Sequence, residues 1–206
     1  QQGRGEHHLH PLLPHQLELL SPARDADIGI EAINHGADAV YIGGPAFGAR
    51  ASAGNDIRDI ERLVKHAHRF NSRIFITLNT ILRDDELEAA RQMAWQVYEA
   101  GADALIIQDL AVYDIVQEHF PEFELHASTQ MAIHNLAGAK QAHEMGFKRV
   151  IAARELTLAE LGEMTDIPNL ELEVFVHGAL CYAYSGLCLL SACLRGGSGN
   201  RGDCAY

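Results

Sequence analysis

From Leu17 onward, short apolar runs alternate along the chain with longer stretches in which apolar residues recur every three or four positions. The apolar runs predict seven strands, at residues 17–21, 39–44, 73–80, 104–109, 124–129, 149–154 and 172–178. The stretches between them predict six helices, at residues 25–34, 57–70, 84–100, 112–119, 135–145 and 158–164. This alternation is typical of β/α units built around a parallel sheet.

A weak internal repeat supports these units. The segments INHGADAVYIGG, YEAGADALIIQD and HEMGFKRVIAAR each place a glycine after a helix and directly before a strand. Gly36, Gly101 and Gly146 are therefore predicted to end helices in the left-handed conformation, which glycine adopts without steric cost. Asp38 and Asp103 follow two of these glycines at the amino-terminal ends of strands. A barrel uses residues there for stability, so we interpret both as structural.

Seven strands and six helices in one series predict an α/β protein, namely a (β/α)8 TIM-type barrel that is incomplete by one unit. An open, doubly wound sheet is the alternative. No GxGxxG sequence follows the first strand, which favours the barrel. We expect residues 1–16 to be a disordered leader or a cloning remnant, residues 17–180 to form the partial barrel, and residues 181–206 to be a truncated, Cys/Gly-rich metal or cluster segment.

Charge and cysteine placement narrow the classes of function. The formal net charge of -12 argues against binding of a nucleic-acid backbone by this chain alone, because such binding depends on clusters of Lys and Arg. No apolar run approaches the roughly eighteen residues of a membrane span, so we expect a cytoplasmic protein without a membrane partner.

All four cysteines lie between Cys181 and Cys204, whereas a disulfide-stapled domain spreads them among its loops. This clustering indicates metal ligation or redox chemistry.

Polar side chains follow several predicted strands at their carboxyl ends, where β/α barrels place their active sites. The site candidates among them are Asn79, Gln108, Ser128, Gln130, Arg154 and His177. Amides and hydroxyls gathered at one mouth suit a polar ligand, so we expect Gln108, Ser128 and Gln130 to bind a cofactor or a small polar cosubstrate. Asn79, Arg154 and His177 are expected to be catalytic. The alternative for each is that it caps the following helix.

The strongest local signal is EVFVHGALCYAYSGLCLLS at residues 173–191, followed by NRGDC at residues 200–204. The fixed positions of this pattern are Glu173, Phe175, Gly178, Ala179, Leu180, Cys181, Gly186, Cys188, Leu190 and Ser191. Together with ELLSPA, HGADAVYIGG and HASTQM upstream, they resemble the peptidase U32 family over residues 17–206. Within the family, LLSPARDADIGIEAINHGADAVYIGGPAFGARA looks most similar to the branch that hydroxylates a cytidine of the large-subunit ribosomal RNA.

The resemblance implies that the intact protein assists iron–sulfur-dependent hydroxylation of RNA bases. It maps the ligands of a 4Fe–4S cluster onto Cys181, Cys188 and Cys204, with a fourth ligand beyond Tyr206, and adds Glu173 to the catalytic candidates. Zinc is the alternative metal, although the gaps between the cysteines do not match paired CxxC knuckles. Cys193 is either a packed small residue or a substitute ligand.

Several alternatives stay open. Other U32 proteins hydroxylate a tRNA wobble uridine or take part in ubiquinone hydroxylation. A collagenase-like peptidase, the older assignment of the family, needs an activated nucleophile or a metal-bound water. The chain has no GxSxG or HExxH sequence, and His177 and Cys181 lack an evident orienting group. A non-catalytic subunit of a homo- or hetero-oligomer is a further alternative. RNA, either rRNA or tRNA, is expected to bind through regions outside this chain.

Overall fold

The computed structural model describes residues 17–46, 54–78, 81–178, 181 and 193. Within them, seven parallel strands form one sheet whose spatial order follows the sequence. The strands are β1 (Leu20–Ala23), β2 (Ala39–Gly43), β3 (Arg73–Leu78), β4 (Ala104–Ile107), β5 (Glu124–Ala127), β6 (Arg149–Ile151) and β7 (Glu171–Glu173). A doubly wound sheet reverses its strand order at a switch point, so the sequential order confirms the barrel-type fold.

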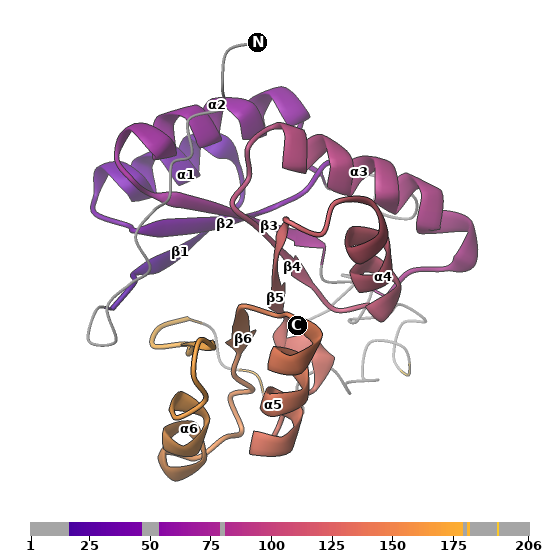
Figure 1. Ribbon diagram of the computed structural model, residues 1–206. Helices are drawn as coiled ribbons and strands as arrows, with labels where there is room; N and C mark the ends of the chain where they lie inside the picture. Colours follow the sequence, from indigo (N-terminus) through magenta and orange to yellow (C-terminus); the bar gives the residue numbers. More distant parts are fainter. Residues whose placement is uncertain (1–16, 47–53, 79–80, 179–180, 182–192, 194–206) are drawn as a thin grey trace.

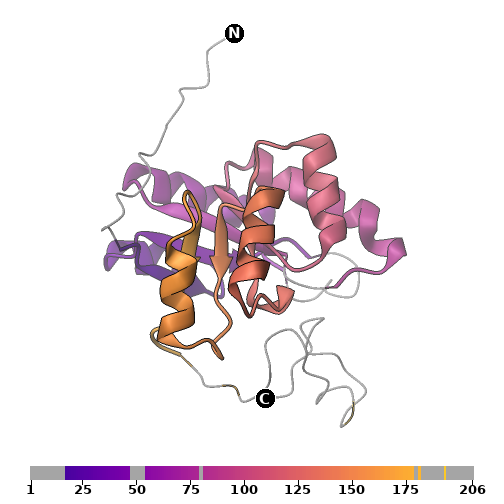
Figure 2. The same cartoon turned by 60° about the horizontal axis from the view of Figure 1, so that its bottom comes forward.

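Among the described residues, six α-helices and two short 3-10 turns connect the strands. The helices are α1 (Ala26–Asn34), α2 (Ile57–Arg69), α3 (Leu87–Glu99), α4 (Leu110–His119), α5 (Leu136–Met145) and α6 (Leu158–Thr165), and the turns are η2 (Asp84–Glu86) and η3 (Thr129–Met131). The helices follow the outer side of the sheet, which curls into an open, TIM-like half-barrel (Figure 1). Figure 2 shows the same arrangement with α5 and α6 turned toward the viewer. No helix in these ranges is long and apolar enough to cross a bilayer.

All seven predicted strands and all six predicted helices are confirmed, with shifts at their ends. The largest shift is in the last strand, which ends at Glu173 rather than at residue 178, and the first strand begins at Leu20 rather than at Leu17. The side chains of Leu17 and Leu19 are exposed, whereas Glu18 between them forms ion pairs with arginines of other strands. The predicted leader at residues 1–16 lies outside the described residues, as does most of the predicted cysteine-rich segment.

Five of the six described helices begin where the sequence supplies a capping side chain, and α3 is the exception. Asp25, Asp56, Asp109, Asn135 and Thr157 each accept a hydrogen bond from a backbone N–H in the first turn of the following helix. Each such cap stabilises a helix by about 1 kcal/mol. Asp109 has a second role, because its other oxygen accepts the N–H of Leu82 at 2.9 Å and ties the β3–α3 connection to the end of β4.

The glycines of the internal repeat adopt the predicted conformation, with φ of +104° at Gly36, +92° at Gly101 and +103° at Gly146. The aspartates of the repeat are structural, as expected. Asp38 Oδ2 accepts the N–H of Leu19 at 2.8 Å, and Asp103 Oδ2 accepts the N–H of Ile74 at 2.7 Å. Each carboxylate thus pairs a backbone donor at the start of a neighbouring strand.

Two apolar clusters lie on opposite faces of the sheet, because successive side chains of a strand alternate between its faces. Ile76 and Ile107 belong to the larger cluster between the sheet and the helices. Phe75 and Ile106, one position earlier in the same strands, belong to a smaller cluster inside the curl of the sheet. Burial of one such side chain contributes about 1.5–3 kcal/mol. Because the inner cluster is small, polar side chains also lie inside the curl of the sheet.

Candidate functional site

Gln108 and Ser128 lie side by side at the carboxyl-terminal mouth of the barrel. Gln108 follows β4 and Ser128 follows β5, and the N–H of Ser128 donates to the carbonyl of Ile107 at 2.9 Å. Both side chains continue the inward-facing positions of their strands, because Ile106 is in the inner cluster and Ile107 is in the outer one. The structure therefore brings together two of the residues that the sequence selected for ligand binding.

Gln130, the third residue selected for ligand binding, belongs to η3, directly after Ser128. The Ser128 hydroxyl accepts the N–H of Gln130 at 3.3 Å, which holds this turn against the end of β5. Ser128 also caps the turn, as the capping alternative anticipated. The Oε1 atoms of Gln108 and Gln130 are both buried without a hydrogen-bond partner. Two amide oxygens at the mouth are thus buried without a hydrogen-bond donor.

Arg154 stands after β6 at the same mouth and reaches the segment that carries the first cysteine of the signature. Its Nε donates to the carbonyl oxygen of Cys181 at 3.0 Å. Its Nη2 is 3.9 Å from the carboxylate of Glu155, which in turn lies 3.9 Å from Nε2 of His134. These contacts connect Cys181 to the loops that follow β5 and β6.

The structure describes only some of the other predicted site residues. His177 is exposed beyond the end of β7 and makes no hydrogen bond among the described residues, and the thiols of Cys181 and Cys193 are free and exposed. Asn79, Cys188 and Cys204 lie outside the described residues. In the part of the chain that the structure does describe, no three His, Cys, Asp or Glu side chains form a metal-binding group. The cluster ligands expected from the sequence therefore stay a prediction.

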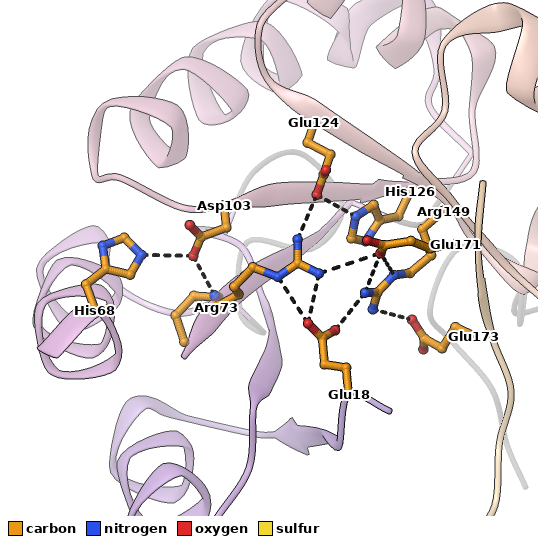
Figure 3. A network of polar contacts seen from close by, with 10 residues as sticks. Glu18, His68, Arg73, Asp103, Glu124, His126, Arg149, Glu171 and Glu173 are labelled. Atoms are coloured by element: carbon orange, nitrogen blue, oxygen red, sulfur yellow. Dashed lines mark hydrogen bonds and ion pairs between the residues drawn. The ribbon is translucent and has the colours of Figure 1, made fainter. Parts of the chain in front are cut away.

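A network of charged residues, which sequence reasoning missed, lies inside the curl of the sheet, around the ring of Phe75 (Figure 3). Four members open their strands, Glu18 precedes β1 by two positions, and His126 and Glu173 are the third residues of β5 and β7. The members are Glu18, Arg73, Glu124, His126, Arg149, Glu171 and Glu173. Arg149 Nη2 is 2.7 Å from Glu18 and 2.6 Å from Glu171, and the Arg73 and Arg149 guanidiniums each lie 5.0 Å from the centre of the Phe75 ring. Charges at the amino-terminal ends of barrel strands serve stability.

The charges of the network hold one another in place. Burial opposes ionisation of Glu18, but Arg149 and Arg73 together lower its pKa below the ordinary value of a glutamate. Complete burial lowers the pKa of His126, so its ring is neutral. The neutral ring donates Nε2–H to Glu124 at 2.9 Å, which leaves Nδ1 as an acceptor, and Nδ1 is buried without a partner.

Glu173, which the sequence selected as catalytic, belongs to this interior network and is partly buried on β7. Its carboxylate accepts a hydrogen bond from Nη1 of Arg149 at 3.5 Å. Burial raises the pKa of Glu173, and Arg149 offsets this only in part. Burial also raises the pKa of Tyr41 on β2, with Glu173 contributing through its negative charge. Glu173 therefore stands apart from the mouth residues Gln108 and Gln130 in its contacts.

One sequence signal could have revealed the network. β3, β5, β6 and β7 each begin with a charged residue, namely Arg73, Glu124, Arg149 and Glu171. The inward-facing periodicity of these strands places every one of them inside the curl. Positive and negative residues at the first positions of several strands thus predict ion pairs inside the barrel. The pairs form only if the sheet curls far enough to bring these residues into contact.

Comparison with known proteins identifies relatives over nearly the whole chain. The sequence model described as "Peptidase family U32" matches residues 25–206. The 23S rRNA 5-hydroxycytidine synthase of Escherichia coli is 52% identical over 191 residues, which cover 93% of this chain and 29% of that protein. The tRNA hydroxylation protein P of the same organism is 38% identical over 91% of this chain and 42% of its own length. An uncharacterized protease of Methanocaldococcus jannaschii is 39% identical over 91% of this chain and 47% of its own length.

Solved structures agree with the fold. A structure of a U32 peptidase superposes with a TM-score of 0.61 at 11% identity, over 84% of this chain and 73% of the other. A putative copper homeostasis protein of Streptococcus agalactiae gives a TM-score of 0.57 at 12% identity, over 85% of this chain and 91% of the other. At such low identity these likenesses show the barrel architecture alone. The chain spans less than half the length of each of the three sequence relatives.

Proposed function

The chain belongs to peptidase family U32, and from this premise we propose that the intact protein assists iron–sulfur-dependent hydroxylation of a cytidine in 23S ribosomal RNA. The similarity to the E. coli 5-hydroxycytidine synthase carries the proposal, because it extends through the barrel and the cysteine signature alike. Relatives named for tRNA hydroxylation share the theme of RNA base hydroxylation at lower identity.

The donor chemistry at the mouth fits an iron–sulfur cluster. Thiolates are the usual ligands of such clusters, and Cys181 offers an exposed thiol whose backbone is anchored by Arg154. Cys181, Cys188 and Cys204 would hold a 4Fe–4S cluster together with a fourth ligand outside this chain. When bound, the cluster would supply one-electron redox chemistry. The role of Arg154 is to fix where Cys181 enters the mouth.

RNA and a small polar cosubstrate are the proposed partners. The net charge of -12 makes this chain a poor electrostatic partner for phosphates, so the RNA backbone is held by other regions of the intact protein. The barrel mouth instead offers buried amide oxygens, which can form directional hydrogen bonds to a base or to a small polar molecule. The mouth would thus receive the target base or the cosubstrate.

The proposal is tested by deleting the gene in the organism that encodes the protein and measuring modified nucleosides by mass spectrometry. Loss of 5-hydroxycytidine from 23S rRNA, restored by the wild-type gene and not by Cys181→Ser, is the expected result. The matched control is Cys193→Ser, a second exposed thiol outside the mapped ligand set. Unchanged 5-hydroxycytidine in the deletion strain would rule the proposal out. Loss of 5-hydroxyuridine from tRNA instead would assign the protein to the other RNA-modifying branch.

A second candidate, peptidase activity, is favoured by the exposed pair His177 and Cys181, four positions apart. A thiol nucleophile needs a neighbouring base that is itself held in place, and no such group contacts His177 among the described residues. This candidate predicts gelatin cleavage by metal-replete protein that is lost in Cys181→Ser. Intact gelatin after prolonged incubation with such protein would exclude it.

A further inference from the structure

Among the described residues, three buried acceptors on β5, after β4 and in η3 have no hydrogen-bond partner. Two are the Oε1 atoms of Gln108 and Gln130 at the mouth, and the third is Nδ1 of His126 on β5. Gln108 and His126 are each at least nine-tenths buried. An unpaired buried acceptor costs about 1–3 kcal/mol, so native proteins rarely leave several in one place without a ligand or ordered water.

The three acceptors belong to adjoining strands. β4 and β5 pair in parallel, with Ile106 beside His126 and Ile107 beside Ala127. Gln108 therefore stands next to Ser128 at the ends of the two strands, and η3 carries Gln130 immediately afterwards. His126 is two positions before Ser128 on the same inward face. The acceptors thus line one side of the barrel, with the two amides at its mouth.

The charge of the interior limits which ligand these acceptors can take. The network below them holds four glutamates and two arginines, and its arginines are already engaged by glutamates. An anionic group would meet unfavourable potential and no unengaged cation of this network. A neutral group that carries N–H donors would satisfy the acceptors without adding charge.

We propose that Gln108 and Gln130 recognise the exocyclic amine of a cytosine base that is turned into the barrel mouth. Cytosine presents an N4 amine with two N–H donors, whereas uracil presents a carbonyl acceptor at the same position. Enzymes that modify a base read its extruded edge by hydrogen bonds inside a pocket. The inference rests on the proposed function and deepens it, because it assigns the choice of cytosine over uracil to two side chains of this chain.

The test measures binding of free nucleosides to the full natural chain, so that backbone contacts to RNA play no part. The probes are cytidine, uridine and N4,N4-dimethylcytidine, whose amine has no donor, titrated at up to millimolar concentration and followed by saturation-transfer NMR. Cytidine is expected to bind at least about tenfold more tightly than either of the other probes, a difference that one or two good hydrogen bonds supply.

Matched variants separate recognition from folding. Gln108→Met removes the acceptor at similar length and is expected to reduce the preference for cytidine over uridine below about threefold. Gln108→Glu keeps an acceptor oxygen and should retain the preference. Gln130→Met provides a second test on the less buried turn, and Gln96→Met, on the exposed face of α3, should change nothing. Thermal unfolding of each variant identifies any that fail to fold.

Equal affinity for cytidine and uridine, no binding of cytidine at millimolar concentration, or an unchanged preference in both folded methionine variants would overturn the inference. These outcomes are distinct from failure of the proposed function. A cytidine preference that depends on Gln108, in a protein whose deletion leaves 5-hydroxycytidine in place, supports the recognition site and refutes the ribosomal role. Loss of 5-hydroxycytidine without any nucleoside preference gives the reverse result.

Discussion

Arg149 Nη2 lies 2.7 Å from Glu18 Oε1, although the two residues are 131 positions apart in the chain. The contact joins the first residue of β6 to the residue that precedes β1 by two positions, and so draws the two sides of the curled sheet together. Arg149 is 4% exposed, and it contacts Glu171 and Glu173 as well. Its single side chain therefore balances three carboxylates.

Arg149→Met is expected to destabilise the protein by about 3–5 kcal/mol, because it leaves buried carboxylates without their counter-charge. Urea unfolding followed by circular dichroism measures the loss. The matched control is Arg62→Met, which removes an exposed arginine paired with Asp27 and Asp59 and should change the stability much less. A smaller loss for Arg149→Met than for Arg62→Met would contradict the role assigned to the network.

Acidification should destabilise the protein through His126. Burial lowers the pKa of this ring in the folded state, so the unfolded chain binds a proton first as pH falls below about 6.5. Stability is then present above that pH and is lost below it. Urea midpoints measured between pH 7.5 and pH 5 test this, with His126→Asn expected to flatten the dependence and His35→Asn, on an exposed helix end, expected to leave it unchanged. A His126→Asn midpoint that varies with pH as the wild-type midpoint does would rule the effect out.

The pKa of His68 should be shifted in the opposite direction from that of His126, upward from the ordinary value of a histidine. The hydrogen bond to Asp103 raises the pKa of His68, so this pair adds stability below the unfolded pKa and loses it as pH rises through the folded one. NMR titration of Asp103→Asn should show the His68 pKa falling toward the ordinary value. Asp38→Asn, which alters the equivalent repeat position without a histidine partner, should not move it.

The same Asp103→Asn variant should also lose stability. The asparagine amide still accepts the N–H of Ile74 but carries no charge. Asp103→Ala leaves that N–H without an acceptor and lowers the free energy of unfolding by about 1–3 kcal/mol. Urea unfolding should therefore rank the wild type above Asp103→Asn and Asp103→Asn above Asp103→Ala. Equal stabilities for all three would show that Asp103 is dispensable to the fold.

Arg154→Gln should lower the amount of iron that the protein retains on anaerobic purification. A hydrogen bond from a charged donor contributes about 1.5–3 kcal/mol, which corresponds to roughly tenfold or more in affinity if it holds Cys181 in place. The iron-to-protein ratio and the visible absorption spectrum report the loss. Arg154→Lys should restore part of it, and Arg24→Gln, a substitution of an exposed arginine on the β1–α1 connection, should retain all of it.

Two glycines should respond to alanine with opposite signs. Gly36 has a φ of +104° and open space around it, so Gly36→Ala adds only backbone strain, about 1–2 kcal/mol. Gly162 lies within α6 and has open space around it, so Gly162→Ala should stabilise by about 0.5–1 kcal/mol. Thermal unfolding of both variants measures the contrast, and a stabilising Gly36→Ala would contradict the left-handed helix end.

Much of the fold could be predicted from local pattern. The apolar runs located the strands, and Gly36, Gly101 and Gly146 marked helix ends. These signals are local, because each depends on the conformation of a few consecutive residues. Candidate mouth residues such as Gln108 and Ser128 followed from the strand ends for the same reason.

The interior of the barrel could not be predicted in this way. The sequence placed Glu18 in an apolar strand, and it did not show that the curl of the sheet brings both Glu18 and Glu173 to Arg149. Likewise, the sequence marks Gln108 and Gln130 as polar, but not as enclosed acceptors without partners. The amino-acid sequence by itself determined the elements, their order and the family. The tertiary structure alone decided which charges meet and which amides stay unpaired, because pairing across the barrel depends on strand register and closure, which join residues more than a hundred positions apart.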